Sequence, residues 1–117
     1  MSGNDMAAFE HFLHGQIECW NSSDKEGFFK HYRDISPNGL TIEYVGRPLT
    51  DAWVILEHMW AEQQPKIRID VVASILNGNE AACHHRNMIV GTDNWIDTIE
   101  LYKYENGKLA VRYFIKQ

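Results

Sequence analysis

Apolar residues recur with a helical period in the first part of the chain. Between residues 5 and 20, Phe9, Leu13 and Trp20 fall on one face of a helix, with Gln16 in the middle of that face. A buried amide costs about 1–3 kcal/mol unless its hydrogen bonds are satisfied. The pattern therefore predicts a helix over residues 5–20 in which Gln16 requires a buried partner or a hydrated cavity.

Two more helices and a strand are predicted before residue 65. Ser23 and Glu26 have the spacing of a capping box, which predicts a short helix through Tyr32. The β-branched and aromatic residues of 40–45 follow a turn signal and predict a strand. Thr50 is the expected N-cap of a third helix, which has a wide apolar face and runs to about residue 64.

From residue 66 onward the period of the pattern changes from helical to alternating. The alternation predicts strands over residues 67–75, 81–90, 95–104 and 109–115. Asn77-Gly-Asn79 and Glu105-Asn-Gly107 are hairpin turn signals, and the second is the strongest in the sequence. Helices followed by consecutive antiparallel strands define the α+β class, with the helices on one face of a curved sheet.

Composition narrows the class of protein further. The chain has 117 residues with 44% hydrophobic residues and a formal charge of −5, which predicts one folded domain over residues 1–117. No polybasic run is present, so neither nucleic acid nor an anionic membrane is an expected partner. Cys19 and Cys83 form no disulfide or zinc pattern. Without a signal-peptide or membrane-span pattern, we expect a cytoplasmic protein.

Cofactor and metal motifs are weak. His11 and His14 are three residues apart near Glu10 and Glu18, but such surface pairs are usually solvated. Glycine-rich phosphate loops and nucleophile elbows do not occur in the sequence. We therefore expect no metal and no cofactor.

Three segments together resemble a known family. They are the helix break and restart of residues 20–32, the strand Thr41-Ile-Glu-Tyr44, and the hairpin of residues 100–109. In their order and spacing they resemble the SnoaL-like and ketosteroid-isomerase-like branch of the NTF2-like superfamily. The resemblance implies a cone of three N-terminal helices on a strongly curved, mostly antiparallel sheet that ends in a four-stranded meander.

The catalytic pattern of the isomerases is mostly absent. By the resemblance, the tyrosine that donates to the oxyanion falls on Gln16, and the tyrosine behind it is matched by Tyr32. The aspartate that transfers the proton falls on Tyr44, and the protonated aspartate of the oxyanion hole falls on Glu100. Steroid isomerisation by that route is therefore not expected.

The resemblance implies a different set of site residues. It turns one face of strand 81–90 into the cone. His84 is then the expected general acid or base, because an imidazole exchanges protons at neutral pH, and Glu100 can orient it. Tyr44 is the third expected catalytic residue. The expected substrate-binding residues are Gln16, Trp20, Tyr32, Trp53, Arg86, Met88, Tyr102, Arg112 and Phe114.

Hydrophobicity alone leaves the inner face of strand 81–90 open. Ala82, His84 and Met88 are as apolar together as Cys83, His85 and Ile89, so His85 rather than His84 is the alternative inner residue. If Arg86 and Glu100 both lie inside, they form either a ligand site or a structural ion pair.

The last strand raises a second conflict. The resemblance turns Arg112 and Phe114 inward, whereas alternation makes Leu109, Val111 and Tyr113 the apolar inner face. Both hold if a second subunit covers the outer face, so a homodimer through the sheet is expected.

An acid–base enzyme of isomerase, cyclase or dehydratase type, acting without a cofactor on a small anionic molecule, is the leading hypothesis. The alternative is a non-catalytic ligand-binding or dimerisation module with structural polar residues. A third possibility is partner recognition without a ligand, in which the cone is filled by its own aromatic residues.

Overall fold

A computed structural model describes residues 3–117. The elements are α1 (Gly3–Asn21), α2 (Lys25–Ile35), β1 (Gly39–Tyr44), α3 (Ala52–Glu62), β2 (Ile67–Asn77), β3 (Glu80–Ile89), β4 (Trp95–Glu105) and β5 (Lys108–Ile115). Their order confirms the predicted α+β class, and most of the element ends lie within about two residues of the ends that the hydrophobic pattern predicts.

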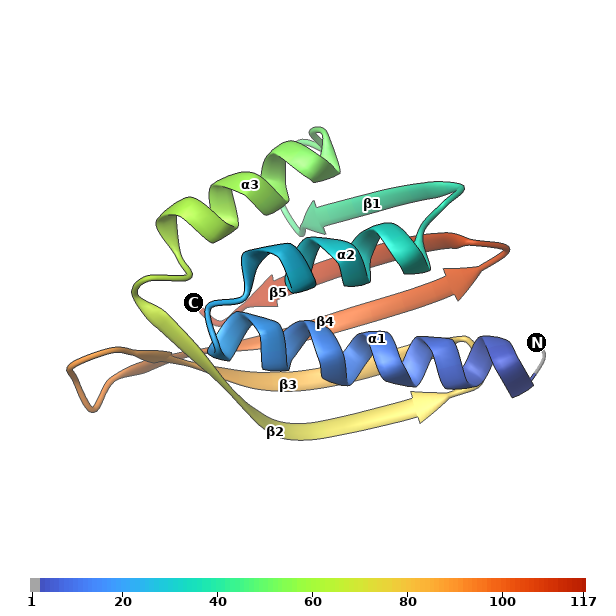
Figure 1. Cartoon of the computed structure of the whole chain (residues 1–117). Coiled ribbons are helices and arrows are strands. Elements are labelled where there is room, and N and C mark those ends of the chain that lie inside the picture. The colour runs from blue at the N-terminus through green and yellow to red at the C-terminus, as the bar shows by residue number, and fades with distance from the viewer. Residues whose placement is uncertain (1–2) are drawn as a thin grey trace.

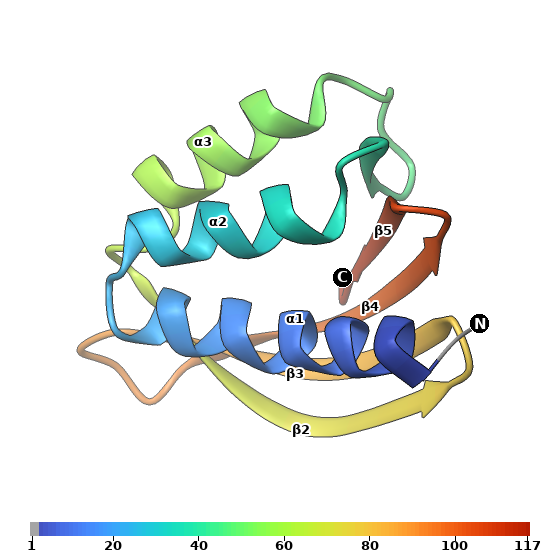
Figure 2. The same ribbon diagram turned by 45° about the vertical axis from the view of Figure 1, so that its right-hand side comes forward.

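The five strands of the described chain form one sheet in the order β1-β5-β4-β3-β2. Strands β2 to β5 are antiparallel neighbours, which confirms the predicted four-stranded meander. Strand β1 pairs in parallel with β5 at the far edge. All three helices lie on one side of the curved sheet, with α1 packed along α2 (Figures 1 and 2). One face of the sheet is therefore covered, and the other carries no helix or strand of residues 3–117.

Aspartates begin the second and third helices, so both predicted caps were wrong by one residue. Asp24 accepts a hydrogen bond from the Gly27 amide at 2.9 Å, while Ser23 adopts a left-handed φ of 62°. Asp51, not Thr50, accepts from the first amides of α3. In both cases the carboxylate is the stronger acceptor and also complements the positive end of the helix dipole.

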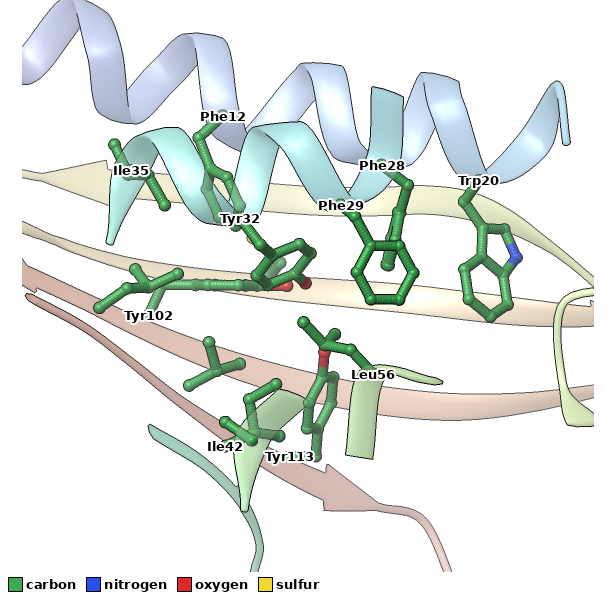
Figure 3. Packing of buried hydrophobic residues seen from close by; sticks show 14 of the residues in the cluster. Phe12, Trp20, Phe28, Phe29, Tyr32, Ile35, Ile42, Leu56, Tyr102 and Tyr113 are labelled. Atoms are coloured by element: carbon green, nitrogen blue, oxygen red, sulfur yellow. The ribbon is translucent and has the colours of Figure 1, made fainter. Parts of the chain in front are cut away.

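Aromatic side chains fill most of the space between the helices and the sheet (Figure 3). Phe12 packs edge-on against Tyr32 with ring centroids 4.9 Å apart, and Phe28 lies 5.1 Å from Tyr32. On the sheet side, Ile42 of β1 and Val111 of β5 are direct neighbours and are fully buried. Large, stiff side chains thus set the distance between helices and sheet near β1 and β5.

The turn between β4 and β5 gives a prediction about stability. Gly107 has φ of 72°, and a Cβ atom there would meet Asn38 Nδ2 at 2.7 Å, whereas Gly78 has φ of 61° and open space around it. We expect Gly78→Ala to lower the free energy of unfolding by about 1 kcal/mol through backbone strain alone. Gly107→Ala should cost about 1 kcal/mol more, because the added methyl group also displaces Asn38. Urea denaturation of both variants measures the difference, and equal losses would contradict this reading of the turn.

Candidate functional site

A cavity of about 360 Å³ opens between the helices and the inner face of the sheet. Most of its wall is apolar, and Trp20, Phe28, Met59, Ile67, Ile69 and Ile96 contribute to it. The polar residues Gln16, Tyr32, Thr98, Glu100 and Tyr113 also line it, and we call these five the polar floor. An apolar enclosure with a few convergent polar groups is the usual form of a small-molecule site.

Glu100 is the charged member of the polar floor, and its side chain is almost completely buried. Its Oε2 atom lies 2.8 Å from His85 Nδ1 and accepts a hydrogen bond from Thr98 at 3.1 Å. Its Oε1 atom accepts from the Tyr102 hydroxyl at 2.6 Å. Three donors thus hold one carboxylate, as a buried charge requires.

Gln16 joins Glu100 to the helices. Its Nε2 donates to the Tyr102 hydroxyl at 3.4 Å, and its Oε1 accepts from the Tyr32 hydroxyl at 3.2 Å. The hydroxyls of Tyr32, Tyr102 and Tyr113 point toward the same region between α2 and the sheet (Figure 3). The predicted requirement of Gln16 for buried partners or a cavity is confirmed, because it has both.

The charges of this network are fixed by the contacts. Burial lowers the pKa of His85, but its contacts with Cys83 and Glu100 raise it by more, to about 9. Burial, and then the charge of Glu100, raises the pKa of Tyr102 well above its ordinary value. At neutral pH the network therefore contains a protonated His85 and a neutral Tyr102, both donating to Glu100.

Arg47 and Tyr44 lie where the cavity meets solvent. Arg47 follows Gly46, which has φ of 94°, and its amide donates to the Tyr44 carbonyl to close a turn at the end of β1. The exposed guanidinium lies 5.9 Å from the centre of the Tyr44 ring. Tyr44 in turn stacks on Tyr113 with centroids 5.2 Å apart. This places a cation at the opening and aromatic surface between it and the polar floor.

Six of the predicted site residues meet in this region. Gln16, Trp20, Tyr32, Tyr44 and Glu100 line the cavity, and Tyr102 lies on the inner face of β4, bonded to Glu100. The Trp20 side chain is held in place by a hydrogen bond from its indole nitrogen to the Ile67 carbonyl at 3.1 Å. Their roles in binding or catalysis stay predictions.

The predicted inward orientation of His84, Arg86 and Met88 was wrong. Residues directly opposite in a sheet share a face, and β3 pairs Cys83 with Glu100 and His85 with Thr98. His85 is 2% exposed and faces the interior, so its neighbours on either side face outward. The half-exposed His84 bonds to Asp97 at 2.8 Å, and the guanidinium of Arg86 lies over the Trp95 ring. Since Arg86 lies outside, the condition for a ligand site or an ion pair formed by Arg86 with Glu100 is not met.

Three further predicted residues lie away from the cavity. Arg112 is on the outer face of β5, where it bonds to Glu43 at 3.0 Å and lies over Phe114. Phe114 is partly exposed on the same face, and Trp53 is partly exposed on α3. The alternation of Leu109, Val111 and Tyr113 gave the inner face of β5 correctly, because burial of large apolar side chains decides which face packs against helices.

Sequence reasoning missed several residues of the site. His85 was considered only as the alternative to His84, and Thr98, Asn87 and Arg47 were not considered. Asn87 lines the cavity and donates to the Thr98 hydroxyl at 3.0 Å. The available signal for the inner faces of β3 and β4 was Glu100. If Glu100 faces inward, alternation along β4 places Thr98 on the same face. Arg47 lies in a loop, where no periodic pattern marks orientation.

Comparison with known sequence families and with curated proteins finds no match. Solved structures do match. A candidate SnoaL-like polyketide cyclase from Jannaschia sp. CCS1 superposes with a TM-score of 0.73 at 12% identity, covering 99% of this chain and 90% of that one. A candidate ketosteroid isomerase from Kribbella flavida gives 0.72 at 12%, covering 95% and 79%.

An NTF2-like protein of unknown function from Burkholderia xenovorans gives a TM-score of 0.71 at 14% identity, covering 98% of this chain and 88% of that one. At these identities the likeness concerns the fold. The chain has the NTF2-like fold, as the resemblance implied.

Two properties of residues 3–117 concern membranes and metals. None of their helices has the length and apolar character needed to cross a bilayer. The same residues contain no group of three or more His, Cys, Asp or Glu side chains placed to hold a metal ion.

The pKa of His85 predicts a pH dependence of stability. Because folding raises this pKa from about 6.5 to about 9, folding is stabilised below pH 6.5, and that contribution is lost as pH rises to about 9. The shift corresponds to a loss of about 3 kcal/mol in the free energy of unfolding across this range. His85→Gln should abolish the loss, since glutamine can still donate to Glu100 but does not titrate.

Chemical denaturation at a series of pH values measures this, with His84→Gln as the matched control on the outer face. The control should keep the loss seen in the original chain. If His85→Gln also keeps it, or if an NMR titration places the pKa of His85 below 7, the ion pair between His85 and Glu100 is absent.

Proposed function

We propose that this protein binds a small, largely apolar organic molecule in the cavity, with the polar end of that molecule on the polar floor. The observation that carries the proposal is the enclosure itself: about 360 Å³ of space remains open beside a buried carboxylate that three donors hold in place. A cavity of this volume lies in the range of small-molecule sites. The relatives in structure, some named for cyclase or isomerase activities, support a ligand site in this fold.

Acid–base catalysis is the second candidate function, and the contact between His85 and Glu100 beside the cavity favours it. An isomerase that forms an enolate also needs donors aimed at the developing oxyanion. Here the hydroxyls of Tyr32 and Tyr102 already donate to Gln16 and Glu100. The geometry therefore supports binding more strongly than enolate chemistry, and any proton transfer would centre on Glu100 rather than on the outward-facing His84.

Blocking the cavity tests the binding function. Ile96 lines the opening, so Ile96→Trp should fill part of it, whereas Val54→Trp adds the same ring to an exposed position on α3. A thermal-shift screen of small aromatic and alicyclic compounds should give ligands that raise the midpoint by several degrees at a hundred times their Kd. These shifts should disappear in Ile96→Trp and persist in Val54→Trp. Shifts that persist in both variants, or a screen without any hit, would count against a ligand in this cavity.

We also propose that the uncovered face of the sheet pairs two copies of this chain. Ile99 and Phe114 are cross-strand neighbours on that face, 42% and 36% exposed, beside a depression of about 350 Å³. Acidic Glu43 and Asp97 and basic Arg112 lie around them, so a twofold axis can bring opposite charges together. Arg86 Nε is buried there without a hydrogen-bond partner among residues 3–117. Arg112 lies on the outer face, so the pairing is supported by the exposed apolar residues of that face and not by an inward Arg112.

Sedimentation equilibrium at micromolar concentrations tests the pairing. Phe114→Glu should convert a dimer into a monomer, because the twofold axis would bring two carboxylates into the same apolar contact. Leu49→Glu, at an exposed leucine in the loop before α3, is the control and should leave the mass unchanged. A monomer before any substitution would disprove the proposal.

A further inference from the structure

The hydroxyl hydrogens of the polar floor are already used inside the protein. Tyr32 donates to Gln16, Thr98 donates to Glu100, and Tyr113 donates to the Tyr32 hydroxyl. Tyr102 also donates to Glu100 from behind the floor, and Asn87 donates to the oxygen of Thr98. These bonds use the hydroxyl hydrogens of the floor, so a ligand on the floor meets mainly oxygen lone pairs.

Glu100 and Gln16 each keep one hydrogen-bonding position open. The ionised carboxylate of Glu100 has about four acceptor positions, and Tyr102, Thr98 and His85 occupy three of them. The Gln16 amide has two N–H hydrogens, and one donates to Tyr102. One acceptor on Glu100 and one donor on Gln16 therefore remain, on two residues that both line the cavity and share the Tyr102 hydroxyl as a partner.

A hydroxyl group matches this pair, because it donates one hydrogen bond and accepts others. An ether or a carbonyl oxygen only accepts, and it would leave the remaining lone pair of Glu100 without a donor. An ammonium group only donates, and its charge would be uncompensated, since His85 already balances Glu100. Burying an unbalanced charge is more costly than burying a hydroxyl with two partners.

Unlike the polar floor, the opening of the cavity favours a negatively charged group. Arg47 is the one Lys, Arg or His among the described residues that line the cavity. Its guanidinium is exposed and lies over Tyr44, which leaves its N–H groups available for a carboxylate. Between the opening and the floor, the rings of Tyr44, Trp20 and Phe28 offer flat apolar surface.

Resting on the proposed binding function, we propose that the ligand is an aromatic hydroxy acid. Its hydroxyl donates to Glu100 and accepts from Gln16, its ring lies against the aromatic wall, and its carboxylate is at Arg47. This arrangement is the reverse of an oxyanion hole: the carboxyl group at position 100 accepts hydrogen bonds from three donors instead of donating one to the ligand.

Calorimetry with a matched series of ligands tests the proposal. The probes are 3-(4-hydroxyphenyl)propionate, its methyl ether, the analogue without a ring substituent, the 4-aminomethyl analogue, and the amide of the hydroxy acid. We expect the hydroxy acid to bind about tenfold more tightly than the three ring analogues, as a buried hydrogen bond to a charged group would give. At low salt the amide should bind about threefold more weakly than the hydroxy acid. This difference should disappear at high salt, because the charge of the exposed Arg47 is then screened.

Substitutions show which residue causes the preference for the hydroxyl and which causes the preference for the carboxylate. Glu100→Gln should reduce the preference for hydroxyl over methyl ether below about threefold, since the new amide can donate to the ether. Arg47→Gln should remove the preference for carboxylate over amide and leave the hydroxyl preference unchanged. Arg33→Gln, on the exposed end of α2, is the control and should change neither ratio. If Glu100→Gln does not fold, the ligand ratios of the original chain still decide the matter.

Equal affinities for the hydroxy acid and its methyl ether would overturn the proposal, and so would failure of the hydroxy acid to bind at millimolar concentration. Either result is separate from failure of the binding function itself. If other compounds give shifts that Ile96→Trp abolishes, the cavity binds ligands of another class; if no compound does, the binding function fails as well.

Discussion

The buried carboxylate of Glu100 is the group on which the arrangement of the interior depends. An ionised carboxylate in an apolar core is tolerated only when donors surround it, and loss of one partner of a buried ion pair costs about 3–5 kcal/mol. Its donors come from β3 and β4, and one of them, Tyr102, accepts in turn from Gln16 of α1. Gln16 and Tyr102 are 86 residues apart in the sequence, so the network around one charge fixes the first helix against the centre of the sheet.

The same network explains how a small domain keeps a cavity. Near β1 and β5 the aromatic core fills the space between the helices and the sheet. At the C-terminal end of α1, polar contacts hold the helix on the sheet instead. Asn21 donates to the Ile69 carbonyl and accepts from its amide, while Trp20 donates to the Ile67 carbonyl. Directional bonds keep these surfaces in place without requiring that the space between them be filled. Open volume therefore lies between an aromatic core and a hydrogen-bonded edge.

The elements of this fold were predictable, whereas the orientation of one strand was not. Helix periodicity, the Asn106-Gly107 turn and the alternation of β5 all rest on strong local preferences, and the structure agrees with each. Strand β3 has no such preference, because its two faces are equally apolar. A shift of one residue exchanges every side chain between core and solvent. The prediction that Glu100 faces inward is confirmed. Its basic partner is His85, whereas the prediction named His84, one residue earlier.

The orientation of β3 links the cavity to the opposite surface of the sheet. In the run His84-His85-Arg86 only the central residue reaches the interior, where it is held by Glu100, and its neighbours contact Asp97 and Trp95 outside. Since the backbone of a paired strand cannot rotate one residue alone, the charge of Glu100 also determines which basic groups the outer face displays. Ligand recognition and self-association would thus depend on one register, and the cavity and the outer depression have Thr98 and Ile115 in common.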